Sequence, residues 1–335
     1  MDGNPLAEDH FATRLNSFAS GAEAYWPDHA GKPSVPMMLE RAGCVDGLTH
    51  VDLNYPDHLE GDADEVASRV VDAGLSISGL AMRYYSDPAF KRGGFTNPDK
   101  SVRKAAIDLT RRGIDQTRRL GSSLMTIWPG QDGFDQNFQA DYNALWSYMV
   151  EALEAIAAHD PGCDISLEYK PNEPRAYSIM PDCASTLLLL KDVGAANTGV
   201  TIDFAHSLYA DEQPALAAAL IGRHSQLLGV HLNDGHAKRD DGLMVGAVHL
   251  QATLELLLQV RRDGFAGPLY FDTFPDVTGL DPVAECETNI AMVRRLVATC
   301  ERLDGSNALS DALDHQDAVA GQAIVNDALL RPVGA

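Results

Sequence analysis

The chain of 335 residues has few cationic side chains: its 26 Lys and Arg face 48 Asp and Glu, which gives a formal net charge of −22. A duplex-binding surface needs clustered cations to contact phosphates, and this excess of carboxylates would repel a nucleic-acid backbone. We therefore expect no nucleic-acid partner. The hydrophobic fraction of 45% is that of an ordinary globular protein, with enough apolar surface to bury a large core.

Long hydrophobic runs are also missing, since no stretch approaches the roughly 18 apolar residues that span a bilayer. The N-terminal segment MDGNPLAEDH has neither the basic head nor the apolar centre of a secretory signal. We expect a cytoplasmic protein without a membrane partner. The cysteines are an odd number without CxxC spacing, which argues against a disulfide framework and against a thiolate metal site. We expect buried, small apolar side chains at all five positions, which are Cys44, Cys163, Cys183, Cys286 and Cys300.

Short runs rich in β-forming residues alternate with stretches of helical periodicity along most of the chain. The eight predicted strands lie at residues 11–19, 47–53, 75–82, 123–129, 164–170, 198–204, 227–233 and 267–274. Clear amphipathic helices are predicted at 101–121, 144–159, 250–264 and 284–303. A strand followed by a helix, repeated eight times, predicts the α/β class and a (β/α)8 TIM barrel.

We expect one catalytic barrel domain over residues 1–303, because α/β barrels often exceed 250 residues as a single domain. Residues 304–335 lie beyond the eighth unit and predict a C-terminal helical extension. Such helices need a surface to pack on, so we expect subunit contacts and a homo-oligomer. The segment 83–100 is too long for a plain connection between strand and helix, and we expect it to cover the active site.

Four consecutive predicted strands end in a side chain that can bind a metal: Glu168, Asp203, His231 and Asp272. The carboxyl ends of barrel strands meet at one mouth, and three carboxylates with one imidazole would repel each other there without a divalent cation. A set of three oxygens and one nitrogen suits Mn²⁺, with Co²⁺ or Mg²⁺ as alternatives, better than structural Zn²⁺. The alternative is that each acid caps the next helix and that His231 is a satisfied core histidine.

A second group of potential ligands lies nearby. Asp203 and His206 can reach one cavity if a helix starts directly after the strand, and the loop after His231 adds His236, Asp240 and Asp241. Two ions sharing Asp203 are therefore plausible.

Two further side chains belong to the same mouth. Lys170 follows Glu168 on the same strand face, where its ammonium could stabilise an oxyanion; the alternative is an ion pair with Glu173 at the rim. Trp128 ends the fourth strand and offers either a platform for a sugar or ordinary core packing.

Several segments resemble the xylose isomerase superfamily over residues 75–275. The segments are DPAFKRGGFTNPD (87–99), TIWPGQDG (126–133), SLEYKPNEPR (166–175), TIDFAH (201–206) and YFDTFP (270–275). The resemblance implies that Glu168 binds a metal, that Lys170 contacts the substrate carbonyl, and that Trp128 packs on the substrate. It also implies a bridging carboxylate at Asp203 with a second-metal histidine at His206.

The chain departs from xylose isomerases at several positions. Asp203 and His231 stand where those enzymes have Glu and Asp, and both are more similar to the rhamnose isomerase branch. In the loop 230–246 the family supplies two aspartates to a second metal. Asp240 matches the first, and Gly242 stands where the second is expected. A second metal would therefore lack one ligand unless Asp241 or water replaced it. The ring-opening histidine of the second strand aligns with Val51, beside His50 on the opposite face.

The resemblance implies a divalent-metal-dependent aldose–ketose isomerase acting on a small sugar, with hydride transfer between C1 and C2. One or two ions per subunit would be held by Glu168, Asp203, His206, His231, Asp240 and Asp272. Glu168, Lys170 and Asp240 would be catalytic, and Trp128, Arg83, Tyr85 and Phe95 would contact the substrate. Family habit implies a dimer or tetramer.

Three alternatives remain open. One is a one-metal keto-sugar epimerase or lyase of the same superfamily, in which Glu168 transfers a proton. A DNA repair nuclease on a related barrel is disfavoured by the charge of −22. The last is a non-catalytic sugar-binding protein.

Overall fold

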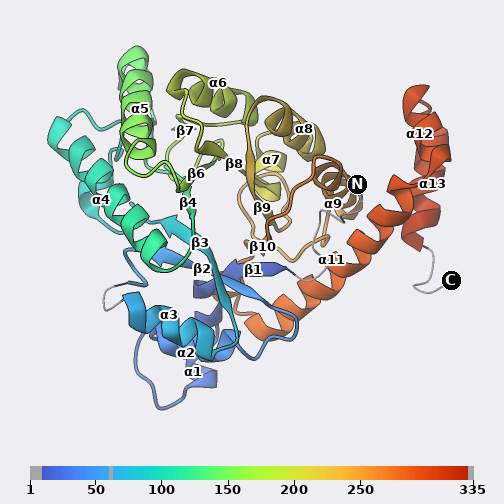
Figure 1. Ribbon diagram of the computed structural model, residues 1–335, viewed down its shortest axis with the longest axis horizontal. Helices are drawn as coiled ribbons and strands as arrows, with labels where there is room; N and C mark the ends of the chain where they lie inside the picture. The colour runs from blue at the N-terminus through green and yellow to red at the C-terminus, as the bar shows by residue number, and fades with distance from the viewer. Residues whose placement is uncertain (1–9, 60–62, 331–335) are drawn as a thin grey trace.

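The computed structural model describes residues 10–59 and 63–330, and its centre is a closed barrel of eight parallel strands (Figure 1). Around the barrel the strand order is β1-β10-β9-β8-β6-β4-β3-β2. The strands are β1 (Phe11–Arg14), β2 (His50–Tyr55), β3 (Ser76–Met82), β4 (Leu124–Ile127), β6 (Asp164–Glu168), β8 (Thr198–Asp203), β9 (Leu227–Leu232) and β10 (Leu269–Phe271). The predicted TIM barrel is confirmed: seven predicted strands contain an observed one, and the second, predicted at 47–53, overlaps β2, which starts later and ends two residues further on.

The first strand is shorter than the predicted 11–19. It ends at Arg14 and continues as the 3₁₀ helix η1 (Leu15–Ala19). Its neighbour β10 ends at Phe271, opposite Thr13, so later residues have no strand to pair with on that side. Ser17 and Ser20 instead donate their hydroxyls to carbonyl oxygens of the segment after β10. The alternating pattern beyond Arg14 therefore covers the barrel mouth and does not extend the sheet.

Helices surround the strands and are started by aspartates at several N-termini. Asp99, Asp141 and Asp182 each accept a hydrogen bond from a backbone N–H of the first helical turn. The helices between the strands are α1 (Ala22–Tyr25), α2 (Val35–Ala42), α3 (Ala63–Asp72), η2 (Pro88–Phe90), α4 (Lys100–Arg119), α5 (Tyr142–Ala157), α6 (Cys183–Val193), α7 (Phe204–Tyr209), α8 (Pro214–His224) and α9 (Leu250–Arg262). After β10 come α10 (Pro275–Thr278) and α11 (Pro282–Asp304).

Two features of the mouth lay outside the sequence prediction. A small antiparallel sheet joins β5 (Gly133–Phe134) to β7 (Tyr177–Ser178) above the ends of β4 and β6. The long loop 83–100 is fixed at one point by the buried carboxylate of Asp132, which accepts hydrogen bonds from Thr96 and from the N–H of Gly94. Both arrangements join loops that follow different strands, so no local pattern predicts them.

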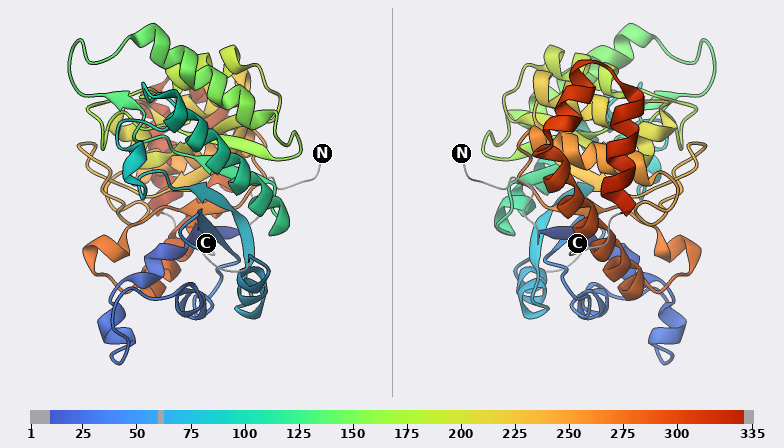
Figure 2. Two further views of the ribbon diagram at one scale, coloured as in Figure 1. Left: turned by 90° about the vertical axis from the view of Figure 1, so that its left-hand side faces the viewer. Right: turned by 90° about the vertical axis from the view of Figure 1, so that its right-hand side faces the viewer.

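The C-terminal extension forms two helices, α12 (Asn307–Asp314) and α13 (Ala318–Leu330), which pack together beside α11 (Figure 2). Arg302 of α11 donates to the carbonyl of Ala328 in α13. The extension therefore finds a packing surface on its own chain, and its role in subunit contacts stays a prediction. Among the described residues no helix is long and apolar enough to cross a membrane.

The prediction for the cysteines is right for four positions. Cys163, Cys183, Cys286 and Cys300 are buried free thiols. It is wrong for Cys44, which is exposed because it lies just after the C-terminus of α2, in the turn before β2.

Candidate metal centre

Glu168, Asp203, His231 and Asp272 converge at the mouth of the barrel. Each offers one ligand atom, and the four atoms lie within 4.8 Å of one another. They come from the ends of β6, β8 and β9 and from the residue after β10, which are neighbours in the barrel. Besides lying in the cluster, Asp203 caps a helix, as the alternative interpretation expected: its carboxylate accepts a hydrogen bond from the N–H of His206 at 2.9 Å at the start of α7. That interpretation does not hold for Asp272, because α10 has no side-chain cap.

The three carboxylates of this cluster favour the presence of a positive charge beside them. Burial raises the pKa of Asp203 to about 7 and also raises that of Asp272. Burial would raise the pKa of Glu168 as well, but the neighbouring His231 and His206 lower it to about 2. Although burial disfavours the charged imidazole, Glu168 and Asp272 raise the pKa of His231 to about 9. In the metal-free protein, protons on imidazole therefore supply the positive charge that these carboxylates need.

The donor atoms fit a divalent ion. His231 Nδ1 is buried and has no hydrogen-bond partner among the described residues, with Glu168 Oε2 at 3.6 Å. The His231 ring stacks on Tyr270 with centroids 4.2 Å apart, which fixes the direction of this nitrogen. An unsatisfied nitrogen beside the buried carboxylates of Glu168 and Asp203 and the half-buried one of Asp272 costs stability unless something binds there. A set of three oxygens and one nitrogen matches Mn²⁺, Co²⁺ or Mg²⁺.

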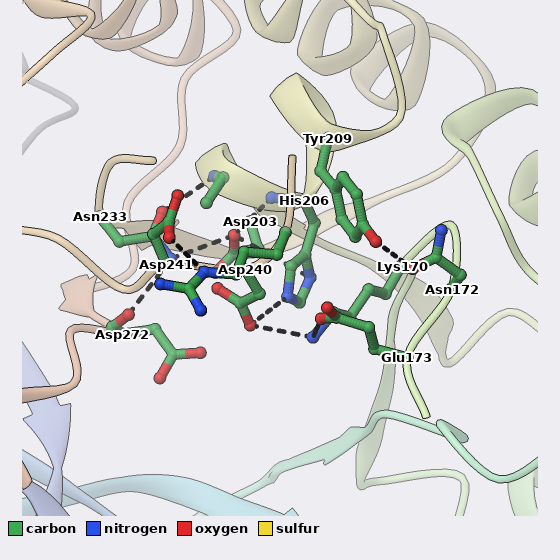
Figure 3. Close-up of polar contacts among 12 residues, drawn as sticks. Lys170, Asn172, Glu173, Asp203, His206, Tyr209, Asn233, Asp240, Asp241 and Asp272 are labelled. Atoms are coloured by element: carbon green, nitrogen blue, oxygen red, sulfur yellow. Dashed lines mark hydrogen bonds and ion pairs between the residues drawn. The ribbon is translucent and has the colours of Figure 1, made fainter. Parts of the chain in front are cut away.

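Asn233, two residues after His231, positions the carboxylate of Asp203. Its fully buried Nδ2 donates to both carboxylate oxygens of Asp203, at 3.2 and 3.0 Å, and to the carbonyl of Asp272 at 3.2 Å. Its Oδ1 accepts the N–H of Ala205 at 2.9 Å (Figure 3). The sequence analysis gave Asn233 no role, although its position just after β9, two residues beyond His231, was a usable signal.

The predicted second group also assembles, as a chain of hydrogen bonds beside the first (Figure 3). His206 lies with Nδ1 3.0 Å from the carbonyl oxygen of Tyr169 and Nε2 3.1 Å from Asp240 Oδ2. Lys170 donates to the same Asp240 oxygen at 3.1 Å and lies 3.0 Å from Glu173. The ion pair with Glu173 is therefore present, and the ammonium also lines the cavity; its role in stabilising an oxyanion stays a prediction.

The charges within this group stabilise each other. Burial opposes protonation of His206, but Asp203 and Asp240 raise its pKa to about 10. Asp240 is nearly buried, yet the cationic His206 and Lys170 hold its pKa well below the usual range. Despite burial, Asp240 and Glu173 also raise the pKa of Lys170. A cationic lysine thus faces the cavity at neutral pH.

A complete second metal site is not formed by this loop. Asp241 accepts a hydrogen bond from the N–H of His236 at 2.8 Å and pairs with Arg239 at 2.7 Å, so both oxygens of its carboxylate bind residues of its own loop. His236 is exposed. Gly242 has φ +58°, and a Cβ there would lie 2.3 Å from the ring of Phe274. The substitution of Asp241 for a missing ligand is therefore not supported, and a second ion would have His206, Asp240 and the bridging Asp203.

The cavity above the cluster has a volume of about 490 Å³. Trp128, Arg83 and Tyr85 line it as predicted, with the Lys170 ammonium 5.3 Å from the Trp128 ring and Tyr85 edge-on to it. Phe95 does not line the cavity. It is fully buried and packs edge-on against Tyr84, because the loop that carries it is pulled inward by Asp132. A larger hollow of about 650 Å³ lies outside the barrel between α8, α9 and the C-terminal helices, far from these groups.

Asp52 on β2 is a cavity residue that sequence reasoning missed. His50, considered for ring opening, lies at the start of β2 beside His10, at the opposite end of the barrel from the mouth. Asp52, two residues later on the same face, lines the cavity instead. Its Oδ1 is buried without a hydrogen-bond partner among the described residues, and burial raises its pKa to about 7.

Comparisons with known proteins agree with this geometry. A family model described as xylose isomerase-like TIM barrel matches residues 42–296. The xylose isomerase of Thermus thermophilus is 30% identical over 207 residues, which are 60% of this chain and 54% of the relative. The chain thus spans about half the length of that curated relative.

Solved structures of the same fold are more distant in sequence. A structure of L-ribulose 3-epimerase matches with a TM-score of 0.67 and 19% identity, covering 89% of this chain and 98% of the other. The D-allulose 3-epimerase from Methylomonas sp. matches with a TM-score of 0.67 and 15% identity, covering 85% and 96%. At these identities they show the fold alone. The match of the family model over most of the barrel shows that the chain belongs to the xylose isomerase-like TIM barrel family.

Proposed function

We propose that this protein is a divalent-metal-dependent sugar isomerase that interconverts an aldose and a ketose. The observation that carries the proposal is the convergence of Glu168, Asp203, His231 and Asp272 within 4.8 Å, beside a lysine that faces the same cavity. A divalent ion held by these four side chains would act as a Lewis acid and a template for two neighbouring sugar oxygens. The donor set favours Mn²⁺, with Co²⁺ or Mg²⁺ as alternatives.

Lys170 is placed to bind the carbonyl oxygen of an open-chain sugar. Its ammonium is held between Asp240 and Glu173 and keeps a raised pKa, so it presents a fixed positive charge. Negative charge that develops on the carbonyl oxygen is stabilised by such a preorganised cation. Trp128, directly below the ammonium, offers an apolar face to the carbon chain and excludes water from that side.

The reaction needs no co-substrate, because aldose and ketose are isomers. One hydrogen moves between C2 and C1, and one proton moves between the oxygens on these carbons. Asp240 is the candidate to accept that proton, because its Oδ1 is buried without a hydrogen-bond partner among the described residues. Lys170 and His206 at Oδ2 keep the pKa of Asp240 low, so it would hold the proton only transiently and pass it on to the second oxygen.

A one-metal keto-sugar epimerase or lyase is the second candidate, and the loop at Gly242 favours it. Asp241 is committed to His236 and Arg239, and the ring of Phe274 fills the space beside Gly242. With one ion, Glu168 would act as acid and base in a proton transfer. Solvent deuterium distinguishes the two: hydride transfer leaves the carbon-bound hydrogens of the product unlabelled, and proton transfer labels the carbon that is reprotonated.

The test is a panel of aldoses and ketoses with Mn²⁺, Co²⁺ and Mg²⁺, comparing wild type with Glu168→Gln. We expect the variant to lose metal affinity and turnover together, because Gln removes the charged ligand at the centre of the cluster. Glu65→Gln, on the exposed face of α3, is the control and keeps both. If Glu168→Gln retains metal binding and activity, the proposal is wrong; sugar binding without turnover under every metal would indicate a binding protein.

A further inference from the structure

The cavity has two halves of different chemistry. The four metal-cluster strands β6, β8, β9 and β10 are contiguous, and β1, β2, β3 and β4 complete the barrel opposite them. The second half contributes Arg14, Asp52, Arg83 and Trp128 to the cavity wall. On the proposed function, the C1 and C2 end of an open-chain sugar lies at the metal cluster. Its far end then extends toward the half that carries the two arginines.

Arg83 is a half-buried guanidinium without a carboxylate partner. Within residues 10–59 and 63–330 its one hydrogen bond is from Nη1 to the carbonyl of Met82 at 3.4 Å, and its buried Nε has no acceptor. Its charge nevertheless acts on the carboxylate of Asp52, which lines the same cavity. Burial raises the pKa of Asp52, and Arg83 is the strongest of the charges that oppose this shift. An Arg presents five N–H donors in a fixed fork, so most of its donors remain available to a ligand.

Two other arginines with little exposure, Arg14 and Arg175, differ from Arg83 in having carboxylate partners. Arg14, in the same cavity, lies 3.4 Å from Asp276 and 3.9 Å from Asp272. Arg175 pairs with Asp135 at 2.9 Å. In a chain of net charge −22 acidic partners are abundant, yet none pairs with Arg83 in the described ranges. A desolvated cation without a counter-ion is costly, so its position is explained if an anion arrives with the substrate.

We propose that the substrate is a sugar acid whose terminal carboxylate binds Arg83, opposite the metal cluster. This inference rests on the proposed function, because that function places the reacting end of the sugar. A carboxylate matches the guanidinium fork with two parallel hydrogen bonds. Asp52, Glu173 and Asp272 also line the cavity, and they repel a phosphate dianion more strongly than a carboxylate monoanion. Arg14, held by its own acids, borders the same half and attracts the ligand from a distance.

The first test compares hexuronates with the matching neutral hexoses on the Mn²⁺-loaded protein. D-Glucuronate, D-galacturonate and D-mannuronate are paired with D-glucose, D-galactose and D-mannose, and D-glucose 6-phosphate is included. We expect at least one acid to exceed its neutral partner in kcat/KM by roughly tenfold or more. In Arg83→Gln this ratio falls by roughly 10- to 100-fold, since a charge-assisted hydrogen-bond pair is lost. Arg83→Lys keeps part of the ratio.

The second test needs no turnover. Calorimetric titration of D-glucuronate, D-galacturonate and D-mannuronate into the metal-free protein gives affinities that Arg83→Gln lowers by a similar factor. The control is Arg223→Gln, which removes the same charge from an exposed position in the last turn of α8 and leaves the preference unchanged.

Three results overturn the inference. Wild type could prefer no acid over its neutral partner; the phosphate could be preferred to every acid; or Arg83→Gln could lower acid and neutral sugars equally, which would mean that Arg83 merely offsets the carboxylates of the metal cluster. Failure of the proposed function is distinguishable from these. In that case no aldose or ketose turns over with any metal, while the hexuronates still bind through Arg83.

Discussion

Metal binding is expected to release a proton from His231 and therefore to depend steeply on pH. In the metal-free protein Glu168 and Asp272 outweigh the effect of burial and raise the pKa of His231 to about 9. Below that pH the imidazole is protonated, and a metal must displace the proton to reach the nitrogen. Affinity for Mn²⁺ or Mg²⁺ should therefore rise with pH by roughly tenfold per unit, and level off above about pH 9.

From about pH 7.5 to about pH 8.5 this amounts to roughly tenfold, or about 1.4 kcal/mol of binding free energy. Below about pH 7 the slope becomes steeper, because burial raises the pKa of Asp203 to about 7 and the metal must then displace a second proton. The assay is calorimetry of Mg²⁺ or Mn²⁺ binding in buffers of different ionisation enthalpy, which counts the protons released per ion. His159→Gln, which removes a histidine paired with Asp115 on the surface, should leave the slope unchanged. An affinity that is flat over this range, or no proton release at about pH 7.5, would refute the assignment of His231 as a ligand.

Three other predictions follow from the same contacts. Asn233→Leu should weaken metal affinity, measured by calorimetry, by roughly 10- to 100-fold because Asp203 loses its two hydrogen bonds. The control Asn197→Leu removes hydrogen bonds to three carbonyls away from the mouth, so it should lower the thermal stability and leave the metal affinity unchanged. Gly242→Asp should not add a second ion but should lower the free energy of unfolding by roughly 2–4 kcal/mol, since it combines positive φ with a clash on Phe274. The control Gly264→Asp, at φ +78° with no atom within 4 Å of its Cβ, should lower it by only about 1 kcal/mol. Equal losses of stability in denaturant unfolding would contradict this prediction. We propose that α12 and α13 contribute to a homo-oligomer through exposed apolar residues such as Leu313 and Val319. The double variant Leu313→Asp with Val319→Asp should therefore lower the mass measured by light scattering. An unchanged mass would rule this contact out.

The barrel was predictable because its signal is local. Each strand is a short run of β-forming residues followed by a stretch of helical periodicity, several of the helices start at an aspartate, and a repeated series of such units is typical of a closed barrel. The strand lengths were less predictable. Whether residues 15–19 continue β1 depends on where β10 ends, and that is set by pairing over more than 250 residues of sequence. The sheet of β5 and β7 has the same origin, since it joins loops after different strands.

The gathering of the four cluster side chains was predictable for a related reason. Glu168, Asp203, His231 and Asp272 are at or next to strand ends, and in a closed barrel the backbone alone brings such positions together. Their role as metal ligands stays a prediction.

Residues that depend on tertiary contacts were harder to assign. Phe95 was expected at the substrate, but the bonds of Asp132 to its loop turn the ring into the core. Asn233 and Asp52 were missed for a related reason. The spacing of Asn233 from His231 indicates which side it faces, but the sequence does not show that its amide holds the carboxylate of Asp203 or that Asp52 lacks a partner.

The number of ions follows from a competition among cations around Asp240. In the metal-free protein the carboxylates of Asp240 and Glu173 are already offset by the ammonium of Lys170 and by protonated His206. Because Asp203 and Asp240 overcome the effect of burial and raise the pKa of His206, a second ion would also have to displace a proton that these carboxylates hold on the imidazole. It would do so with fewer ligands, since Gly242 supplies none and Asp241 is turned into its loop. The same lysine that suits the carbonyl oxygen therefore weakens the second position, and the first ion is expected to bind alone over a wide range of concentration.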